Sequence, residues 1–510
     1  MQAIIVPLGI LVLTLLLYTF KQKIQSKSHG RNYPPGPTLK QFGNNAIPGK
    51  PWVQYTELAK KYGPIMHFDS GGGHIVVLST EQAANDLFEK RSRLYSSRSQ
   101  NPVLDLMGWD WAITFLPYAD EWRAQRRMIH QGLRLEAIKQ HQPLQLRKLQ
   151  EILQYVLDDP SNFAQSYRML SASITMQAVY GYTVEGPDDR FVAIAEEAVK
   201  TLETAVMYSG VLASRSLHFL RYLPAWFPGA SSRRMAEDAA PVVRRMADVP
   251  FAFVKDQIAQ GKSSACLASD LLESHRFRQG TEVEEALIKH TTAAIYGGAA
   301  DTTTSSILFF ILAMILHPHA AKRAQAEIDS FLRGVRLPTF EDRPHLPYIE
   351  AIFREVLRWR PAIPLGVPHA VIDDDVYEGY FIPKGTTLIG NIWAMTRDNN
   401  RYPDPETFKP ERYLDTQGKF NGDTVIHAWG FGRRICPGRY FADATVWATI
   451  ACSLAVFDFA FAKDENGQEI PVNADDVTDT LVVLPKPFKC SITPRSSVAE
   501  SLIREQPLAQ

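Results

Sequence analysis

Apolar residues recur at helical spacing along most of the chain after residue 80. Residues 143–159 and 286–317 carry the clearest 3.6-residue pattern. A further apolar helix is expected from about residue 438 to residue 456. Helices therefore dominate the predicted structure.

Strand patterns are few and short. Residues 65–79 read as two strands around a Gly-rich turn. Residues 378–394 read as a hairpin with its turn near Pro383, and residues 479–495 read as strands again. The sequence thus predicts a mainly α (α+β) fold, with one large helical mass and a small β-rich region.

The long segment of residues 286–317 is apolar nearly all round, as a membrane helix would be. However, Asp301 lies in its middle, followed by three threonines. A lipid-facing carboxylate would be costly, so we expect a buried central helix of a soluble domain.

The N-terminus has a different pattern. Residues 3–20 contain no charge and are followed by Lys21, Lys23 and Lys27. A signal peptide would have its basic residues before the apolar run, so the pattern favours an uncleaved transmembrane anchor with the body on the cytoplasmic side. The Pro-rich residues 33–37 that follow predict a stiff hinge or an ordinary loop.

Composition excludes several classes of protein. The chain has 510 residues, 45% of them hydrophobic, and equal numbers of basic and acidic residues, 55 each. A nucleic-acid-binding protein would normally show a basic excess. Four cysteines without C-x-x-C spacing fit neither a structural zinc site nor a disulfide scaffold.

One of these cysteines, Cys436, lies in a loop suited to binding a planar anion. Gly432 and Gly438 allow a sharp turn and close approach of a flat ligand. Arg434 offers a fixed cation for a carboxylate. A single thiolate beside such a cation fits haem, whose iron takes an axial cysteine and whose propionates need positive partners. A buried structural thiol is the alternative.

The loop resembles the haem-thiolate signature of the cytochrome P450 family, F-x-x-G-x-R-x-C-x-G. Its fixed positions are occupied by Trp429, Gly432, Arg434, Cys436 and Gly438. Only Trp429 departs from the pattern, because the family usually has Phe there. The resemblance implies that Cys436 is the axial ligand of haem b iron.

Further marks of the family occur in the same order along the chain. Glu355, Arg358 and Arg412 look like its Glu-Arg-Arg structural triad. An exposed Glu–Arg pair one helical turn apart would have little value, so this interpretation depends on the cysteine loop downstream.

Residues for the two haem propionates are implied in the same way. Trp122 and Arg126 match the family's W-x-x-x-R, and Arg434 belongs to the cysteine loop. His369 stands where the family often has an arginine or histidine for the second propionate.

The predicted central helix supplies the catalytic residues. Residues 297–303 resemble the family's A/G-G-x-D/E-T-T, with Ala299 in the usual glycine position. The resemblance implies that Thr302 orients oxygen and water while Asp301 relays the protons that O–O cleavage requires.

The resemblance spans about residues 33–490 and implies a single-domain cytochrome P450 fold. We expect a transmembrane anchor at residues 1–20, a linker with a Pro-rich hinge at residues 21–50, the haem-thiolate domain at residues 51–495 and a tail at residues 496–510.

The implied enzyme is a monooxygenase of the endoplasmic reticulum membrane with a cytosolic catalytic domain. Because the chain has no flavin or nicotinamide motif, electrons are expected from an NADPH-cytochrome P450 reductase that docks near Arg433 and Arg439. The sequence is similar to fungal microsomal members that modify secondary metabolites, so a lipophilic terpenoid or polyketide substrate is expected. An aromatic amine such as a tryptamine is the alternative.

The substrate pocket is expected to be mostly apolar. Its predicted lining segments are residues 107–112, 295–301, 362–367 and 480–482. Residues 206–230 either dip into the membrane or form ordinary core.

Two other functions remain open. One is a haem-thiolate isomerase or dehydratase that uses no oxygen, which the acid–alcohol pair Asp301 and Thr302 disfavours. The other is a non-catalytic haem sensor or a membrane-tethered interaction protein.

Overall fold

The computed structural model describes residues 32–37, 49–70, 73–186, 188–212, 226, 231–274 and 281–505. The predicted anchor, most of the predicted linker and residues 506–510 lie outside this part of the chain. Within it, one helix, α13 (Glu282–Leu316), is long and apolar enough to cross a membrane, but 72% of its most apolar window is buried in the protein. The prediction of a buried central helix is confirmed.

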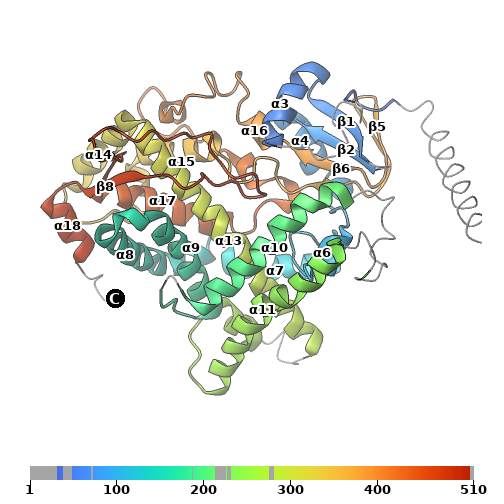
Figure 1. Ribbon diagram of the computed structural model, residues 1–510, viewed down its shortest axis with the longest axis horizontal. Helices are drawn as coiled ribbons and strands as arrows, with labels where there is room; N and C mark the ends of the chain where they lie inside the picture. The colour runs from blue at the N-terminus through green and yellow to red at the C-terminus, as the bar shows by residue number, and fades with distance from the viewer. Residues whose placement is uncertain are drawn as a thin grey trace, which may run out of the picture.

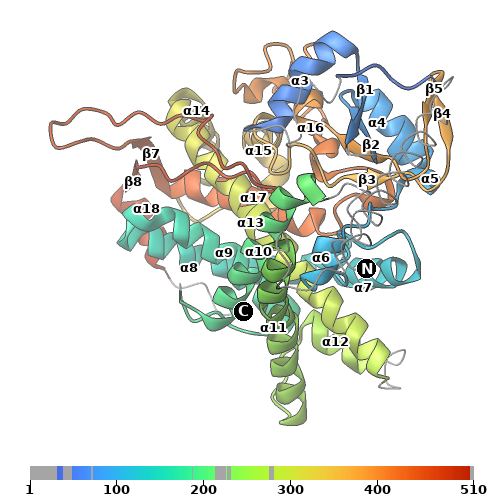
Figure 2. The same ribbon diagram turned by 45° about the vertical axis from the view of Figure 1, so that its right-hand side comes forward.

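Helices make up most of the domain and gather around α13 (Figures 1 and 2). The longer ones are α3 (Pro51–Tyr62), α7 (Asp120–Leu133), α8 (Gln142–Asp158), α9 (Phe163–Tyr180), α10 (Arg190–Leu212), α11 (Ser231–Ala259), α14 (Pro318–Leu332), α15 (Pro347–Trp359) and α17 (Arg439–Val456). The shorter ones are α4 (Glu81–Ala84), α5 (Ser92–Tyr95), α6 (Pro102–Leu106), α12 (Leu267–Glu273), α16 (Ile392–Met395) and α18 (Ser497–Arg504).

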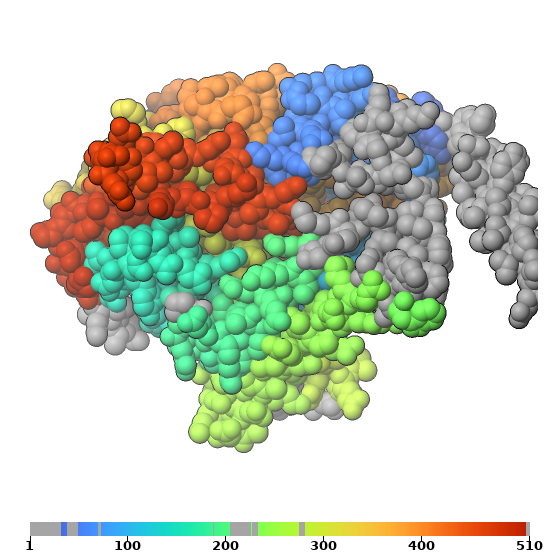
Figure 3. Space-filling model, in the orientation of Figure 1, coloured from blue at the N-terminus to red at the C-terminus, as the bar shows by residue number. Residues whose placement is uncertain are grey.

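α13 is covered on several sides by other helices. It packs against α7, α9, α11 and α17. The space-filling view shows α8, α10, α11 and the C-terminal segment forming the surface over it on one face (Figure 3). The helix begins at the cap Thr281, whose side chain accepts a hydrogen bond from the Glu284 N–H at 3.3 Å.

The main sheet has the strand order β1-β2-β6-β3. Its strands are β1 (Ile65–Ser70), β2 (Gly73–Leu78), β6 (Thr387–Gly390) and β3 (His369–Ala370). β1 and β2 pair antiparallel, as the sequence predicted, whereas β2 and β6 pair parallel. Two small sheets add β4 (Asp375–Tyr377) with β5 (Tyr380–Ile382), and β7 (Phe457–Phe461) with β8 (Cys490–Pro494).

The predicted hairpin of residues 378–394 is wrong. β5 pairs with β4 across a turn at Glu378 and Gly379, which both have positive φ. β6 pairs instead with β2 and β3. Pro383 offers no N–H to continue the β5 ladder, and the chain crosses there to the main sheet. In the predicted C-terminal strand region, only Cys490–Pro494 forms a strand.

The described part of the predicted hinge packs on the sheets. The Pro35 carbonyl accepts the His67 N–H at 3.0 Å, and the Asn32 carbonyl accepts the Phe381 N–H at 2.7 Å. The ring of Tyr33 stacks on His67 with centroids 4.9 Å apart.

The predicted Glu-Arg-Arg triad is confirmed and lies in the core. Arg358 donates from Nε and Nη2 to the two carboxylate oxygens of Glu355, each at 2.7 Å, and both side chains have no exposed surface. Arg412 adds an ion pair to Glu355 at 3.1 Å. The triad joins α15 to the irregular segment that leads to the cysteine loop.

Candidate active site

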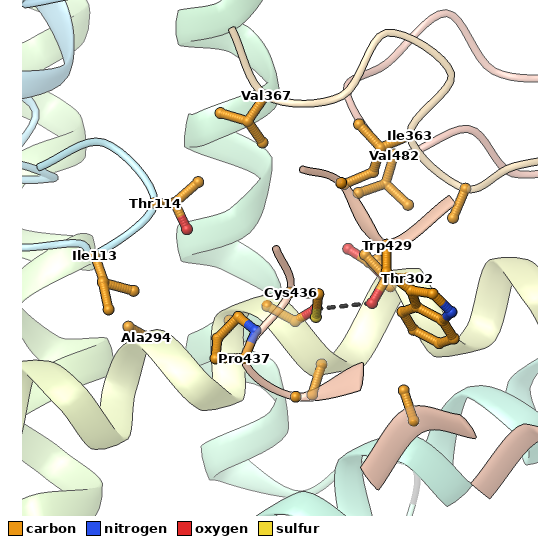
Figure 4. A pocket seen from close by; sticks show the side chains of 18 of the residues that line it. Ile113, Thr114, Ala294, Thr302, Ile363, Val367, Trp429, Cys436, Pro437 and Val482 are labelled. Atoms are coloured by element: carbon orange, nitrogen blue, oxygen red, sulfur yellow. Dashed lines mark hydrogen bonds between the residues drawn. The ribbon is translucent and has the colours of Figure 1, made fainter. Parts of the chain in front are cut away.

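A cavity of about 340 Å³ opens between α13 and the loop that carries Cys436. Its walls also come from α7, α9 and α10, and from the segments around residues 363 and 482. Thr302 from α13 and Cys436 from the loop face this space (Figure 4). Of the four cysteines, only Cys436 lines the cavity.

The loop reaches Cys436 through a tight turn that requires glycine. Gly432 has φ +52°, and a Cβ there would lie 2.0 Å from the Phe88 carbonyl oxygen. The Cys436 N–H donates to the Trp429 carbonyl at 2.8 Å. Gly438 precedes the first residue of α17 and also lines the cavity. The two predicted glycines thus differ in their surroundings: Gly432 lies against the backbone of Phe88, whereas Gly438 faces open space.

Burial dominates the electrostatics of the thiol. It raises the pKa of Cys436, while the Gly438 N–H and the charges of Arg126 and Arg439 act in the opposite direction. A thiolate in this position therefore needs a further positive partner, such as a metal ion. The part of the chain that the structure describes has no cluster of three or more His, Cys, Asp or Glu suited to a metal ion.

Arg434 is buried in the wall beside the loop. Its guanidinium donates to three backbone carbonyls, those of Ser96 (2.7 Å), Ile113 (3.1 Å) and Leu116 (2.7 Å). It also lies over the ring of Trp122, 4.5 Å from the centroid.

Trp122 and Arg126 both come from α7 and line the cavity, as the W-x-x-x-R spacing predicts. Arg126 donates from Nη1 to the Ile435 carbonyl at 2.7 Å, which places its charge next to the cysteine loop. Burial and the charge of Arg126 lower the pKa of Arg434 to about 9.

A third arginine, Arg98, was not found from the sequence. Its guanidinium donates to the carbonyls of Thr114 (2.9 Å), Val367 (2.7 Å) and Pro368 (2.9 Å). Burial and the nearby charge of Arg434 lower its pKa far below the usual value. No local spacing marks Arg98, because the segments that bury it are distant in sequence.

His369 lies in the same wall and packs against Phe88, with ring centroids 4.2 Å apart and the ring planes tilted by 30°. Its Nδ1 is 2.7 Å from the Tyr95 carbonyl, so this nitrogen donates and Nε2 remains for another partner. Burial and the charge of Arg98 lower the pKa of His369 well below its usual value.

The donor set of this wall fits haem. The charges that influence Arg98, Arg126 and Arg434 include no carboxylate among the described residues. Burying cations without a counter-ion is costly, so the wall is suited to a ligand that brings negative charge. Haem would supply two propionates for these arginines and an iron for the Cys436 sulfur.

On the opposite side of the cavity, Asp301 and Thr302 lie in mid-helix on α13. Thr302 donates from Oγ1 to the Gly298 carbonyl at 2.8 Å. Asp301 is 15% exposed and accepts a hydrogen bond from Arg168 Nη2 at 2.5 Å. A second carboxylate on the cavity wall, Glu203 of α10, was not predicted from the sequence.

The remaining walls are mostly apolar, and the four predicted segments all contribute to them. The structure adds lining residues that the sequence did not indicate: Phe88, Ile113, Phe115, Ile174, Val199 and Leu202. Most of residues 206–230, expected either to dip into the membrane or to form ordinary core, lies outside the described residues.

Comparisons with known proteins agree over nearly the whole chain. The family model for Cytochrome P450 matches residues 34–492. A cytochrome P450 monooxygenase of Armillaria gallica is 36% identical over 440 residues, covering 85% of each chain. Cytochrome P450 monooxygenase COX2 of Coprinopsis cinerea is 35% identical over 494 residues, covering 94% of this chain and 93% of its own.

A zebrafish cytochrome P450, solved with abiraterone, has a similar fold. Its TM-score is 0.68 at 22% sequence identity, and the match covers 88% of this chain and all of the zebrafish one. The chain is thus a mainly helical protein with small sheets that belongs to the cytochrome P450 family of haem-thiolate monooxygenases.

Proposed function

We propose that this protein inserts one oxygen atom of O₂ into a lipophilic small molecule, with Cys436 as the axial ligand of haem b iron. The observation that carries the proposal is the pairing of a cavity-lining cysteine with three arginines, two of them buried and one half-buried, that have no carboxylate partner among the described residues. A structural thiol would explain neither the arginines nor the cavity.

The loop and its wall hold the cofactor. Arg434, Arg126 and Arg98 would bind the propionates, and the ring of Trp122 packs against the guanidinium of Arg434. His369, whose Nδ1 donates to the Tyr95 carbonyl, would offer Nε2 to a propionate. Gly432 shapes the loop, and a Cβ at Gly438 would meet no atom within 4 Å, so this side of the loop would be open to the macrocycle.

Bound haem would activate O₂ and transfer one oxygen atom of O₂ to the substrate. Thr302 presents its hydroxyl to the cavity beside Asp301, and the carboxylate of Asp301 moves protons toward that hydroxyl. The apolar walls hold the substrate and exclude water from the reaction.

The substrate is a terpenoid or polyketide-derived molecule of fungal secondary metabolism. The mostly apolar lining supports a lipophilic substrate, and the relatives from Armillaria, Coprinopsis and Postia are fungal monooxygenases. An aromatic amine such as a tryptamine is the second candidate, and the carboxylate of Glu203 on the cavity wall favours it.

The protein is a single-pass protein of the endoplasmic reticulum membrane. Residues 1–20 form the anchor, residues 21–50 the linker, and residues 51–495 the cytosolic catalytic domain, followed by the tail of residues 496–510. The electron donor is an NADPH-cytochrome P450 reductase on the same membrane.

One spectrum and one incubation test this proposal. The reduced, CO-bound protein should show the absorption band of thiolate ligation, and Cys436→Ala should lose it. Incubation with the reductase, NADPH and O₂ should convert terpenoid, polyketide or tryptamine candidates to products heavier by one oxygen atom. A Cys436→Ala variant that keeps the thiolate band would refute the ligand assignment. Turnover without NADPH or O₂ would indicate an isomerase, and a bound haem without any turnover would indicate a sensor.

A further inference from the structure

Arg168 of α9 lies behind Asp301 as seen from the cavity. Its Nη2 is 2.5 Å from Asp301 Oδ1, and the two side chains are 34% and 15% exposed. Asp301 lines the cavity, whereas Arg168 does not. The guanidinium therefore contacts the carboxylate from the side away from the reaction space.

α9 holds the same turn of α13 at a second point. Ser171, one helical turn after Arg168, donates from Oγ to the Ala299 carbonyl at 2.9 Å. One contact fixes the backbone just before Asp301 and the other fixes its side chain. Together they set the position of the Asp301 carboxylate relative to Thr302.

Arg168 also balances an excess of negative charge. Its Nε lies 3.7 Å from Glu196 Oε1 on α10, and Glu203 of the same helix interacts with it as well. Burial and the charge of Asp301 raise the pKa of Glu203. Without the guanidinium, three carboxylates would repel one another and Asp301 would carry a largely buried, unpaired charge.

We propose that Arg168 is a positioning residue for proton delivery, which fixes the Asp301 carboxylate beside Thr302. The inference rests on the proposed role of Asp301. In productive turnover, O₂, two protons and two electrons from the reductase give one hydroxyl oxygen in the substrate and one water. If protons arrive out of place, the same two protons and two electrons leave with O₂ as hydrogen peroxide, and the substrate is unchanged.

The test compares Arg168→Gln, Arg168→Lys, Asp301→Asn and the double variant Arg168→Gln/Asp301→Asn, each with the reductase, NADPH and O₂. The readout is hydrogen peroxide released per NADPH consumed. We expect Arg168→Gln and Asp301→Asn each to raise this ratio several-fold, because the proton donor is displaced in one variant and removed in the other. Arg168→Lys, which keeps the charge, should remain close to the wild-type protein.

The double variant decides whether Arg168 acts through Asp301. It should match Asp301→Asn alone, because the arginine then has nothing left to position. Since it removes the largely buried charge of Asp301 together with its partner, it also serves if Arg168→Gln does not fold. Arg245→Gln is the matched control: it removes another inter-helical ion pair, Arg245 to Glu197 at 3.5 Å, and should leave the ratio unchanged.

Three outcomes would overturn the inference. These are a wild-type ratio in Arg168→Gln, an additive effect in the double variant, and an equal effect in Arg245→Gln. If Asp301→Asn itself has the wild-type ratio, the proposed role of Asp301 fails first and the inference with it. The CO spectrum of each variant reports separately on the thiolate site.

Discussion

The guanidinium of Arg434 lies close enough to Arg98 for its charge to lower the pKa of Arg98, although both side chains are buried. Neither has a carboxylate partner among the described residues. Such a pair of like charges is stable only because backbone carbonyls surround each guanidinium, and an anion between them would relieve the repulsion.

Arg98→Ala and Arg434→Ala should therefore weaken haem retention. A hydrogen bond to a charged group contributes about 1.5–3 kcal/mol, so we expect haem to dissociate about 10- to 100-fold faster in each variant. The measurement is haem transfer to a competing apoprotein, followed by absorbance. Arg433→Ala, which removes an exposed neighbour, is the control. If Arg98→Ala transfers haem at the wild-type rate, Arg98 does not contribute to haem binding.

The two glycines of the cysteine loop should respond differently to alanine. Gly432→Ala places a Cβ 2.0 Å from the Phe88 carbonyl oxygen at a φ of +52°, so the loop must shift. Gly438→Ala meets no atom within 4 Å, so the fold should be kept. We expect Gly432→Ala to lower the unfolding temperature and the yield of thiolate-ligated protein. Gly438→Ala should keep the unfolding temperature of the apoprotein and lower only the haem content, and identical behaviour of the two variants would contradict this distinction.

What the sequence predicted well is encoded over short distances. Cys436, Gly432 and Arg434 lie within five positions of one another, and Glu355 and Arg358 are one helical turn apart. Local spacing fixes such geometry before any long-range contact forms. The position of Asp301 in an apolar run was likewise enough to identify the central helix.

What the sequence missed depends on contacts between distant segments. Arg168 meets Asp301 across 133 positions, and Arg98 meets the Val367 carbonyl across 269. The residues next to Arg168 and Arg98 in the sequence show no pattern that distinguishes these arginines from exposed ones. The pairing of β5 and β6 failed for a related reason, because strands of three or four residues carry too little alternation to indicate a partner.

The buried triad should be important for stability. Glu355→Gln leaves the charge of Arg358 unpaired at a site without solvent, and it weakens the hydrogen bond from the Lys409 N–H, which is 2.7 Å long. Breaking a buried ion pair costs about 3–5 kcal/mol, so the urea midpoint should fall sharply. Glu500→Gln, at an exposed pair with Arg504, should cost less than about 1 kcal/mol. Equal losses of unfolding free energy in the two variants would show that the triad stabilises the fold no more than an exposed ion pair does.

Reductase docking can be tested at Arg433 and Arg439. Arg433 is exposed and donates to the Tyr118 hydroxyl at 2.6 Å, whereas Arg439 donates to the Cys436 carbonyl at 3.3 Å. Reversing both charges to glutamate should slow reduction by the reductase, more at low than at high ionic strength, because exposed charges are screened by salt.

Stopped-flow reduction under CO measures this rate directly. Arg433→Glu alone is the cleaner variant, since Arg439 also contacts the cysteine loop. Arg504→Glu on α18 is a remote control that should reduce normally. Unchanged rates in the double charge reversal would mean that the partner docks elsewhere.

Three histidines, of which His427 is buried and His67 and His290 are half-buried, should make the fold sensitive to mild acid. Burial lowers the pKa of His67, His290 and His427 to about 4 each. In the unfolded chain these groups titrate near 6.5, so between pH 6.5 and 4 the unfolded state binds more protons than the folded state. Stability should therefore be constant with respect to these groups above pH 6.5 and should fall as the pH drops through this window.

His427 offers the sharpest test, because it is only 1% exposed. The lowered pKa of His427 corresponds to a free energy of unfolding on the order of 3 kcal/mol, which is lost as the pH falls to 4. His427→Leu removes the titrating group, so its urea midpoint should change less between pH 7 and pH 4.5 than that of the wild-type protein. The carboxylates titrate in both proteins and cancel in this comparison. The exposed His130→Leu should retain the wild-type pH dependence, and an equally steep fall in His427→Leu would show that this histidine is not the acid-sensitive group.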